Sequence, residues 1–369
     1  MASAFLSAAL IVRDEERFLE GCLRSLGGRV DDIVVVDTGS NDHSREIARD
    51  FGARVFEYAW NDDFAAARNA SIEAARGSWI LYIDADERLV EFDRATVERL
   101  LSDQRTVCYT VLFRPTTGYT RYREYRLFRN RPDLRFEGMI HESLVPALRM
   151  LCSRERLRTS ESPVAIDHLG YDGDLRHKHV RNLPLLKARL ERDPDHLYCL
   201  DQLGLTLRAL GDQASAEATW RQAIDVVRKP PRREELADSL PFLHLAQLLL
   251  DTKRDAGALL DEACRVFPDN HALTWLRARW LVETGDHAGA MPLFERLAAI
   301  DASTMPAAPI AYDASIFGAQ AHAALGLCAF RLGRFAESAE HYARAEALAP
   351  RDLEIRAKRA VAENRARSA

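Results

Sequence analysis

Acidic residues follow two apolar runs in the first quarter of the chain. Asp37 ends one run, and Asp84, Asp86 and Glu87 follow another at residues 79–83. Three carboxylates within four residues repel one another unless a cation or solvent offsets their charge. Hard divalent cations prefer carboxylate oxygens and keep open positions for phosphate groups. We therefore expect Asp84 and Asp86 to form a site for a hard divalent cation, with Asp37 on a neighbouring strand.

Each of these acids also has a purely structural alternative. Asp37 precedes Thr38, Gly39 and Ser40, which suit a tight turn and a helix N-cap. The acids after residue 83 would favour the N-terminus of a following helix. The functional interpretation is that an aspartate at a strand end accepts hydrogen bonds from a nucleobase or ribose lying over the sheet edge.

The elements that must position these acids alternate between apolar runs and helical patterns over residues 1–170. The apolar runs lie at 5–12, 33–36, 53–56 and 79–83, and the helical patterns lie around 18–26, 44–51 and 64–76. Strands that are apolar on both faces and separated by helices are typical of a mostly parallel, Rossmann-like sheet. In such sheets ligands bind beyond the carboxyl ends of the strands, where these acids fall.

The apolar run at the start of the chain is also a candidate signal peptide. It lacks a positively charged beginning and a small-residue cleavage site, and it leads directly into Arg13 and Asp14. A first β-strand explains it better. Since no run reaches the ~18 apolar residues that a membrane span needs, we expect a cytoplasmic protein without a membrane span.

From about Asp174 the strand signals stop and helix–turn–helix patterns follow. Glycine turns precede small residues of a second helix in the pairs Gly211 and Ala216, Gly285 and Ala290, and Gly333 and Ser338. The step from Ala256 to Ala290 is 34 residues, the tetratricopeptide period. A plain helical bundle is the alternative, but the recurring turns favour an all-α domain of tetratricopeptide-type repeats.

Length and composition agree with two soluble domains. A chain of 369 residues exceeds one ordinary core and fits two domains of about 150–200 residues. We expect an α/β domain over residues 1–173, a linking helix over 174–192 and a repeat domain over 193–369. The net charge of −5 gives no general attraction to nucleic acid. The six scattered cysteines form no C-x-x-C pair, which favours free thiols over disulfides or a zinc site.

Several motifs in order resemble those of family 2 inverting glycosyltransferases, which have the GT-A fold. They are Arg13-Asp14-Glu15-Glu16, Asp37-Thr38-Gly39-Ser40, Phe64-Ala65-Ala66-Ala67-Arg68-Asn69 and Ile83-Asp84-Ala85-Asp86-Glu87. The resemblance covers roughly the α/β half of the chain. It implies that Asp37 contacts uracil and that Arg68 lies near the nucleotide. It also implies that Asp84 and Asp86 serve the nucleotide and Mn²⁺ or Mg²⁺.

The same resemblance implies a catalytic base near the acceptor, at a helix start beyond the second acidic motif. Glu142 is our first candidate for this base, and His141 is the alternative, as base or metal neighbour. Polar residues that merely begin a helix are the structural alternative. His168, at the end of a further strand-like run, is expected at the metal or diphosphate, although a lone histidine there is often structural.

Arginines alternate with aromatic residues between residues 119 and 135. Such a pattern could stack on single-stranded nucleic acid, but an acidic chain with no recognised nucleic-acid fold argues against this. A strand with a solvated face is the structural alternative for most of the run. We expect Arg126 and Arg129 to approach the diphosphate or the acceptor.

The combination with tetratricopeptide repeats resembles bacterial peptide glycosyltransferases of the sublancin S-glycosyltransferase type. This implies transfer from a nucleotide sugar, with UDP expected, to a Cys, Ser or Thr side chain of a peptide or protein. The combination also resembles sugar transferases of lipopolysaccharide core assembly, which implies a saccharide acceptor. The repeats would handle the acceptor or form a homodimer.

Two other classes of function fit less well. A nucleotidyltransferase should carry a glycine-rich phosphate loop where Arg13 and Asp14 stand. A non-catalytic repeat adaptor with a vestigial sugar-nucleotide domain has no reason to keep mutually repelling acids.

Overall fold

A computed structural model describes residues 5–116, 118–170, 176–230 and 235–368. Its internal contacts divide the chain into two compact units. The first unit comprises Met1–Thr117 and Arg121–Pro194, and the second comprises Gly118–Thr120 and Asp195–Ala369. Each unit is described below by itself. In the described parts of the chain, no helix has both the length and the apolar character that crossing a membrane requires.

Strands and helices alternate through the first part of unit 1. The strands are β1 (Leu6–Val12), β2 (Asp32–Asp37), β3 (Arg54–Glu57), β4 (Trp79–Tyr82), β5 (Glu87–Glu91), β6 (Thr106–Pro115), β7 (Tyr122–Arg129) and β8 (Arg158–His168). The helices are α1 (Glu16–Leu26), α2 (Ser44–Asp50), α3 (Phe64–Ala74), α4 (Arg94–Leu101), α5 (Val145–Glu155) and α6 (Arg176–Arg192). The start of the predicted linking helix, at residues 174 and 175, lies outside the described residues.

The strands form one eight-stranded sheet in the order β3-β2-β1-β4-β7-β6-β8-β5. Strands β3, β2, β1 and β4 are parallel, as predicted. The other half is mixed, because β7 runs antiparallel to β4 and β6, and β5 runs antiparallel to β8. The short connection between β6 and β7 can join only an antiparallel pair, whereas a parallel pair needs a long crossover. The sheet is therefore less uniformly parallel than the apolar runs indicate.

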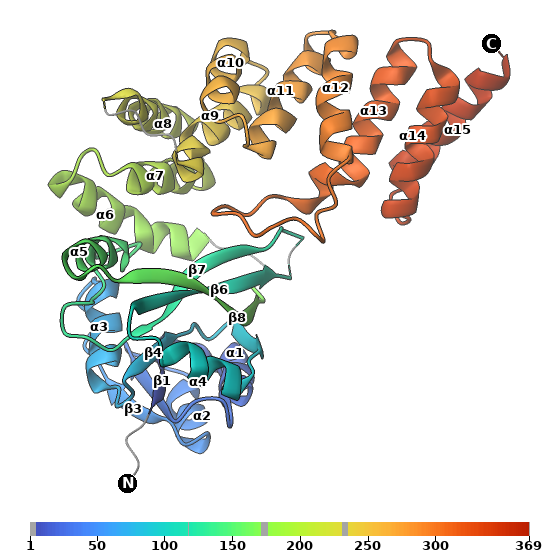
Figure 1. The fold of residues 1–369 in the computed structure, drawn as a ribbon. Coiled ribbons are helices and arrows are strands. Elements are labelled where there is room, and N and C mark those ends of the chain that lie inside the picture. The colour runs from blue at the N-terminus through green and yellow to red at the C-terminus, as the bar shows by residue number, and fades with distance from the viewer. Residues whose placement is uncertain (1–4, 117, 171–175, 231–234, 369) are drawn as a thin grey trace. The chain divides into compact units, whose positions relative to one another are not determined.

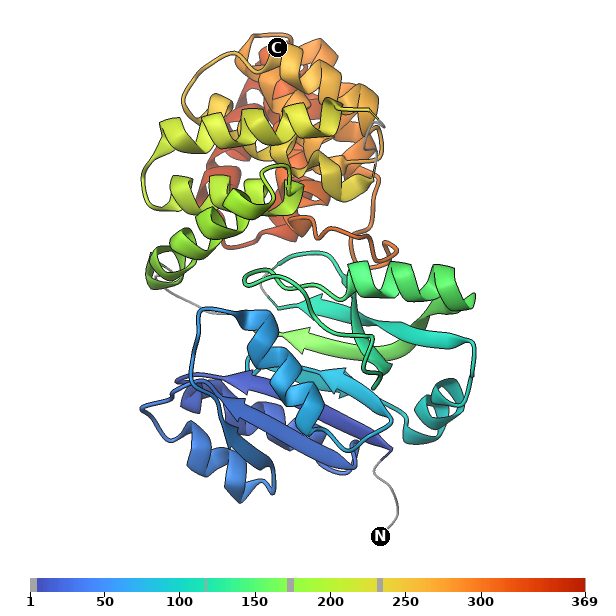
Figure 2. The ribbon, with the colours of Figure 1, turned by 90° about the vertical axis from the view of Figure 1, so that its left-hand side faces the viewer.

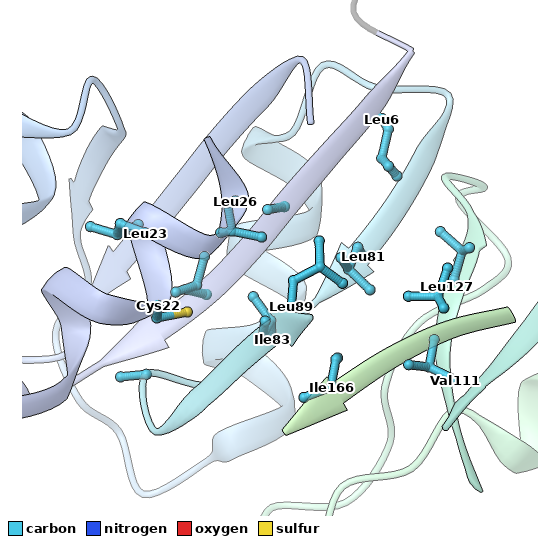
Figure 3. Close-up of a cluster of buried hydrophobic side chains, with 14 of the residues drawn as sticks. Leu6, Cys22, Leu23, Leu26, Leu81, Ile83, Leu89, Val111, Leu127 and Ile166 are labelled. Carbon is cyan, nitrogen blue, oxygen red and sulfur yellow. The ribbon is translucent and has the colours of Figure 1, made fainter. Parts of the chain in front are cut away.

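Helices cover both faces of this sheet (Figures 1 and 2). On one face, α1, α2 and α4 pack on alternate residues of β1, including Leu6, Leu10 and Val12. Figure 3 shows part of this cluster, in which Cys22 and Leu26 of α1 lie against the strands. On the other face, α3 and α5 pack on Ala9 and its neighbours. The two clusters confirm an α/β domain with a sheet that is buried on both sides.

Most of the described part of unit 2 is helical. Its helices are α7 (Leu197–Ala209), α8 (Gln213–Arg228), α9 (Leu240–Asp251), α10 (Gly257–Val266), α11 (His271–Glu283), α12 (His287–Ala298), α13 (Ala319–Arg331), α14 (Phe335–Leu348) and α15 (Leu353–Ser368), with 3₁₀ turns η1 (Leu236–Ser239) and η2 (Ala314–Phe317). Three of the small residues predicted for the second helix of a pair are fully buried within it: Ala216, Ala290 and Ser338. Ala256, which was aligned with them, is also buried but lies just before α10, as its N-cap.

Close helix contacts explain why small residues are needed in the repeats. Gly204 of α7 lies so near Trp220 of α8 that an added Cβ would come within 2.3 Å of the indole nitrogen. The turn between these helices passes through Gly211 at a φ of +95°, a conformation that favours glycine. The all-α repeat architecture predicted for this half of the chain is confirmed.

Candidate active site

The ends of β1, β2 and β4 meet at one edge of the sheet, beside a cavity of about 300 Å³. Its lining comes from these strand ends, from α3 and from α6. The lining residues are Ile11, Val12, Arg13, Glu15, Thr38, Trp60, Phe64, Arg68, Asp84, Ala85, Asp86, His168, Lys178 and Arg181. The structure therefore brings four of the predicted site residues to one cavity: Arg68, Asp84, Asp86 and His168.

Asp37 ends β2 next to Thr38 on the cavity wall and is almost completely buried. Its Oδ1 accepts hydrogen bonds from the N–H groups of Gly39 and Ser40 at 3.1 and 3.0 Å. Its Oδ2 is also buried but has no hydrogen-bond partner within the described part of the chain. An unsatisfied buried acceptor is costly, so this oxygen is suited to a donor group of a ligand.

Asp84 lies between two arginines. Arg68 donates to Asp84 Oδ1 at 3.0 Å, and Arg126 donates to Asp84 Oδ2 at 3.4 Å. Burial alone would raise the pKa of Asp84, but the two guanidinium groups outweigh burial and lower it to about 2. Asp84 is therefore a carboxylate at any physiological pH, and its negative charge is already compensated by the protein.

Asp86 has a different partner. Its Oδ2 lies 3.3 Å from Nε2 of His168 at the end of β8, and both side chains line the cavity. The backbone N–H of Leu169 donates to the carbonyl of Asp86, which fixes the two segments side by side. The hydrogen bond to Asp86 raises the pKa of His168 above its ordinary value. Unlike Asp84, Asp86 forms no ion pair with an arginine of the described residues.

The predicted base, Glu142, is held by Arg68. The Arg68 Nε–H donates to Glu142 Oε1, so one guanidinium bridges Glu142 and Asp84. The segment that carries Glu142 is fixed on α3, because Asn69 exchanges two hydrogen bonds with the backbone of Phe136. Neither Glu142 nor His141 is among the cavity-lining residues. Their catalytic roles stay predictions.

Arg126 lies inside the protein, away from the cavity wall. It forms ion pairs with Glu87 at 3.0 Å, with Glu124 at 2.8 Å and with Asp84 at 3.4 Å. Its guanidinium also stands 4.1 Å from the ring centroid of Tyr82. These partners suit a residue that holds carboxylates in place better than one that reaches a nucleotide, the role predicted for it.

Two basic residues of the cavity were missed by the sequence analysis. Lys178 and Arg181 reach the lining from α6. Burial lowers the pKa of Lys178, although Asp86 and Glu15 oppose this shift. The Arg181 guanidinium stands 5.1 Å from the ring of Phe64, which packs edge-on against Trp60. The available signal was the basic run at residues 176–181, soon after His168.

The donor atoms at the cavity fit a hard divalent cation only in part. In the described stretches of sequence, no group of three or more His, Cys, Asp or Glu side chains could hold a metal ion. Asp86 and His168 offer one carboxylate and one imidazole. Since Mg²⁺ is commonly held by one or two carboxylates together with substrate phosphates, the pair fits a cation whose remaining ligands come from a diphosphate and water.

Comparisons with family models give two matches. Residues 7–157 match the model of glycosyl transferase family 2, and residues 319–352 match a tetratricopeptide repeat. The first match includes β1 through α5, with Asp37, Arg68, Asp84, Asp86 and Glu142. The second match includes α13 and α14.

Three similar proteins are named either for TPR repeats or as glycosyltransferases. A TPR repeat-containing protein of Synechococcus elongatus is 38% identical over 69% of this chain and 65% of its own length. The glycosyltransferase SunS of Bacillus subtilis is 26% identical over 69% of this chain and 62% of its own length. A lipopolysaccharide core biosynthesis glycosyltransferase of Rhizobium meliloti is 32% identical over 38% of this chain and 57% of its own length. The chain thus spans less than two thirds of the length of each of these relatives.

Proposed function

We propose that this chain, which carries a glycosyltransferase family 2 domain and a tetratricopeptide repeat, transfers a sugar from a UDP-sugar to a side chain of a peptide or protein. The observation that supports this most strongly is the cavity at the strand ends. Asp86 and His168 line this cavity together with Lys178 and Arg181 of α6. Acidic, imidazole and basic groups together suit a nucleoside diphosphate and its cation.

Asp37 is the proposed contact for the nucleobase. Its buried Oδ2 has no partner in the described residues and lies at the end of β2, beside the cavity-lining Thr38. The imide N–H of uracil would satisfy that acceptor. A carboxylate in this position discriminates against bases that present an acceptor there, because two acceptors would face each other without a proton.

Asp86 and His168 are the proposed protein ligands of Mn²⁺ or Mg²⁺. When bound, such a cation would neutralise the negative charge that develops on the departing diphosphate. Lys178 and Arg181 would bind the same diphosphate from the side of α6. Asp84, whose charge is offset by Arg68 and Arg126, would orient the donor sugar or ribose by accepting hydrogen bonds.

Glu142 is the proposed base of an inverting transfer. Its carboxylate would take the proton of the attacking hydroxyl or thiol while the acceptor atom bonds to the anomeric carbon and UDP leaves from the opposite face. In the structure this carboxylate forms an ion pair with Arg68. A bound donor that draws Arg68 toward its own phosphates would release the Glu142 carboxylate for the acceptor. His141 is the second candidate for this role.

The acceptor is proposed from the similarity to SunS and from the helical repeats, which suit extended peptides. A saccharide acceptor is the second candidate, because the Rhizobium meliloti relative is named for lipopolysaccharide core biosynthesis. The full-length protein should be incubated with a UDP-sugar, Mn²⁺ and either candidate peptides or core oligosaccharide, and the products weighed by mass spectrometry. A hexose added to peptide supports the proposal, whereas modification of the oligosaccharide alone supports the second candidate.

A further inference from the structure

Two histidines of unit 2 face each other across the α13–α14 helix pair. His322 of α13 and His341 of α14 have their Nδ1 atoms 3.4 Å apart. The ring planes differ by 27° and the ring centroids are 5.6 Å apart. Because the centroids are farther apart than the nitrogens by about the size of one imidazole ring, the two Nδ1 atoms lie at facing edges of the rings. Neither histidine belongs to the cavity described above.

The backbone beneath this pair is tightly fixed. Gly326 lies one turn after His322, and a Cβ at Gly326 would come within 2.9 Å of the ring of Tyr342. The hydroxyl of Ser338 donates to the Gly326 carbonyl at 2.7 Å. Two helices in such close contact present the histidines at a set separation, so little conformational entropy is lost when both rings bind one ligand.

The separation of the nitrogens matches that of two ligands on one metal ion. Zinc binds imidazole nitrogen at about 2.0–2.1 Å, which places two nitrogens of a tetrahedral site about 3.3–3.4 Å apart. Both side chains are only partly buried, so an ion can reach them from solvent. We propose that His322 and His341 together bind one transition-metal ion of the zinc, nickel or copper class.

The surroundings keep the two rings in the form that binds metals. A ligating imidazole must be neutral. Burial lowers the pKa of His322, helped by His341 and Arg344, and burial also lowers the pKa of His341. The carboxylates of Glu337, Glu295 and Glu340 act on His341 in the opposite direction and would offset part of the charge of a dication.

The site would differ from the proposed cation site of the cavity in its metal preference. Among the described residues no third side chain completes a ligand set, so water would fill the other positions. Two imidazoles favour zinc, copper and nickel, whereas magnesium prefers oxygen ligands. The inference does not depend on the proposed function, since it concerns helices that carry none of the residues assigned to the transfer.

The test uses full-length protein freed of metal with a chelator. Calorimetric titration with Zn²⁺ should show one site, and Zn²⁺ but not Mg²⁺ should raise the melting temperature. Substitution of a residue that hydrogen-bonds a metal ligand typically weakens metal binding about 10–100-fold. Loss of a ligand itself should cost at least as much, so His322→Gln and His341→Gln should each weaken Zn²⁺ binding at least about tenfold. His287→Gln, on α12 of the same unit, is the matched control and should bind Zn²⁺ like the unmodified protein.

A second measurement needs no variant and therefore does not depend on the folding of one. Cu²⁺ bound to the unmodified protein should show electron paramagnetic resonance couplings to two imidazoles. Wild-type Zn²⁺ affinity in both histidine variants would overturn the proposal, and would assign the binding to another site such as Asp86 and His168. Copper spectra with fewer than two imidazoles, or no binding of Zn²⁺ at all, would overturn it as well.

Discussion

At the scale of single residues, the two aspartates of the acidic motif have different partners. Arg68 and Arg126 neutralise Asp84, whereas Asp86 has His168 as its partner. A carboxylate that is already paired with two arginines gains less from a cation than one whose partner is a single histidine. We therefore assign the larger part of cation binding to Asp86, and a structural and donor-orienting part to Asp84.

The first prediction concerns Asp86. UDP should raise the melting temperature of the unmodified protein strongly in the presence of Mn²⁺ and weakly after chelation. A ligand selective for the folded state adds about 2.7 kcal/mol to stability at 100 times its dissociation constant. In Asp86→Ala the Mn²⁺-dependent part should disappear, as measured by differential scanning fluorimetry. An undiminished Mn²⁺ effect in this variant would remove Asp86 from the cation site.

The second prediction concerns Glu142. Glu142→Gln keeps the shape of the side chain but cannot accept a proton, so UDP-sugar binding should persist while transfer slows by about 10²–10⁴-fold. The loss should be smaller with a thiol acceptor, because a thiol ionises far more readily than a hydroxyl. Single-turnover kinetics with both acceptor types measure the effect. Unchanged transfer to a hydroxyl would shift the role of base to His141.

Some residues of the candidate site could be predicted from the sequence, and others could not. Asp37, Asp84 and Asp86 were found because each follows an apolar strand, a purely local signal. Lys178 was missed because it lies on a helix, and its place at the cavity depends on how α6 packs. The pairing of Glu142 with Arg68 spans 74 positions of sequence, and no local pattern reports it.

At the scale of elements, α3 connects the residues proposed to bind the donor with the segment that carries the proposed base. Its N-cap is Asp63, whose side chain accepts a hydrogen bond from the N–H of Ala66 at 2.9 Å. One turn later it carries Arg68, and then Asn69, which anchors the segment leading to Glu142. The parallel strands around α3 follow from apolar runs in the sequence. The antiparallel half of the sheet does not, because its strands β5, β6, β7 and β8 lie outside the four apolar runs found in the sequence.

The third prediction tests this element. Asp63→Ala removes the N-cap of α3 and should lower the free energy of unfolding by about 1 kcal/mol. It should also weaken UDP binding several-fold, because the first turn of α3 lies at the cavity. Asp93→Ala is the matched control: it removes the equivalent cap of α4, whose Asp93 accepts from the N–H of Thr96.

The control variant should lower stability but leave UDP affinity unchanged, since no residue of α4 lines the cavity. Urea denaturation and calorimetric titration of both variants separate the two effects. Equal losses of UDP affinity in the two variants would show that general destabilisation, and not the position of α3, controls binding.

At the scale of the whole molecule, the chain consists of two units with separate cores. All residues assigned to the donor and the base belong to unit 1, and the repeats contribute none of the cavity lining. The repeat half was predictable as an architecture because its turn glycines and buried small residues recur. Its acceptor was not, because helical repeats that bind peptides and repeats that form dimers share the same packing residues.

The fourth prediction separates the two units. A chain that ends after Pro194 retains all of unit 1. It should therefore still bind and slowly hydrolyse its sugar nucleotide. It should lose most transfer to a peptide or protein acceptor if the repeats handle that acceptor. Circular dichroism checks the fold, and mass spectrometry compares products of the truncated and full-length proteins. Full peptide transfer by the truncated protein would contradict this role of the repeats.

The most direct test of the central claim measures the donor reaction alone. Chelator-treated full-length protein and its Asp86→Ala variant are each incubated with a panel of sugar nucleotides, with and without Mn²⁺, and the released nucleoside diphosphate is quantified by chromatography. The account predicts that UDP is released from a UDP-sugar only when the cation is present and only by the unmodified protein. Release that is equal in Asp86→Ala, or a panel in which no UDP-sugar is cleaved, would contradict it.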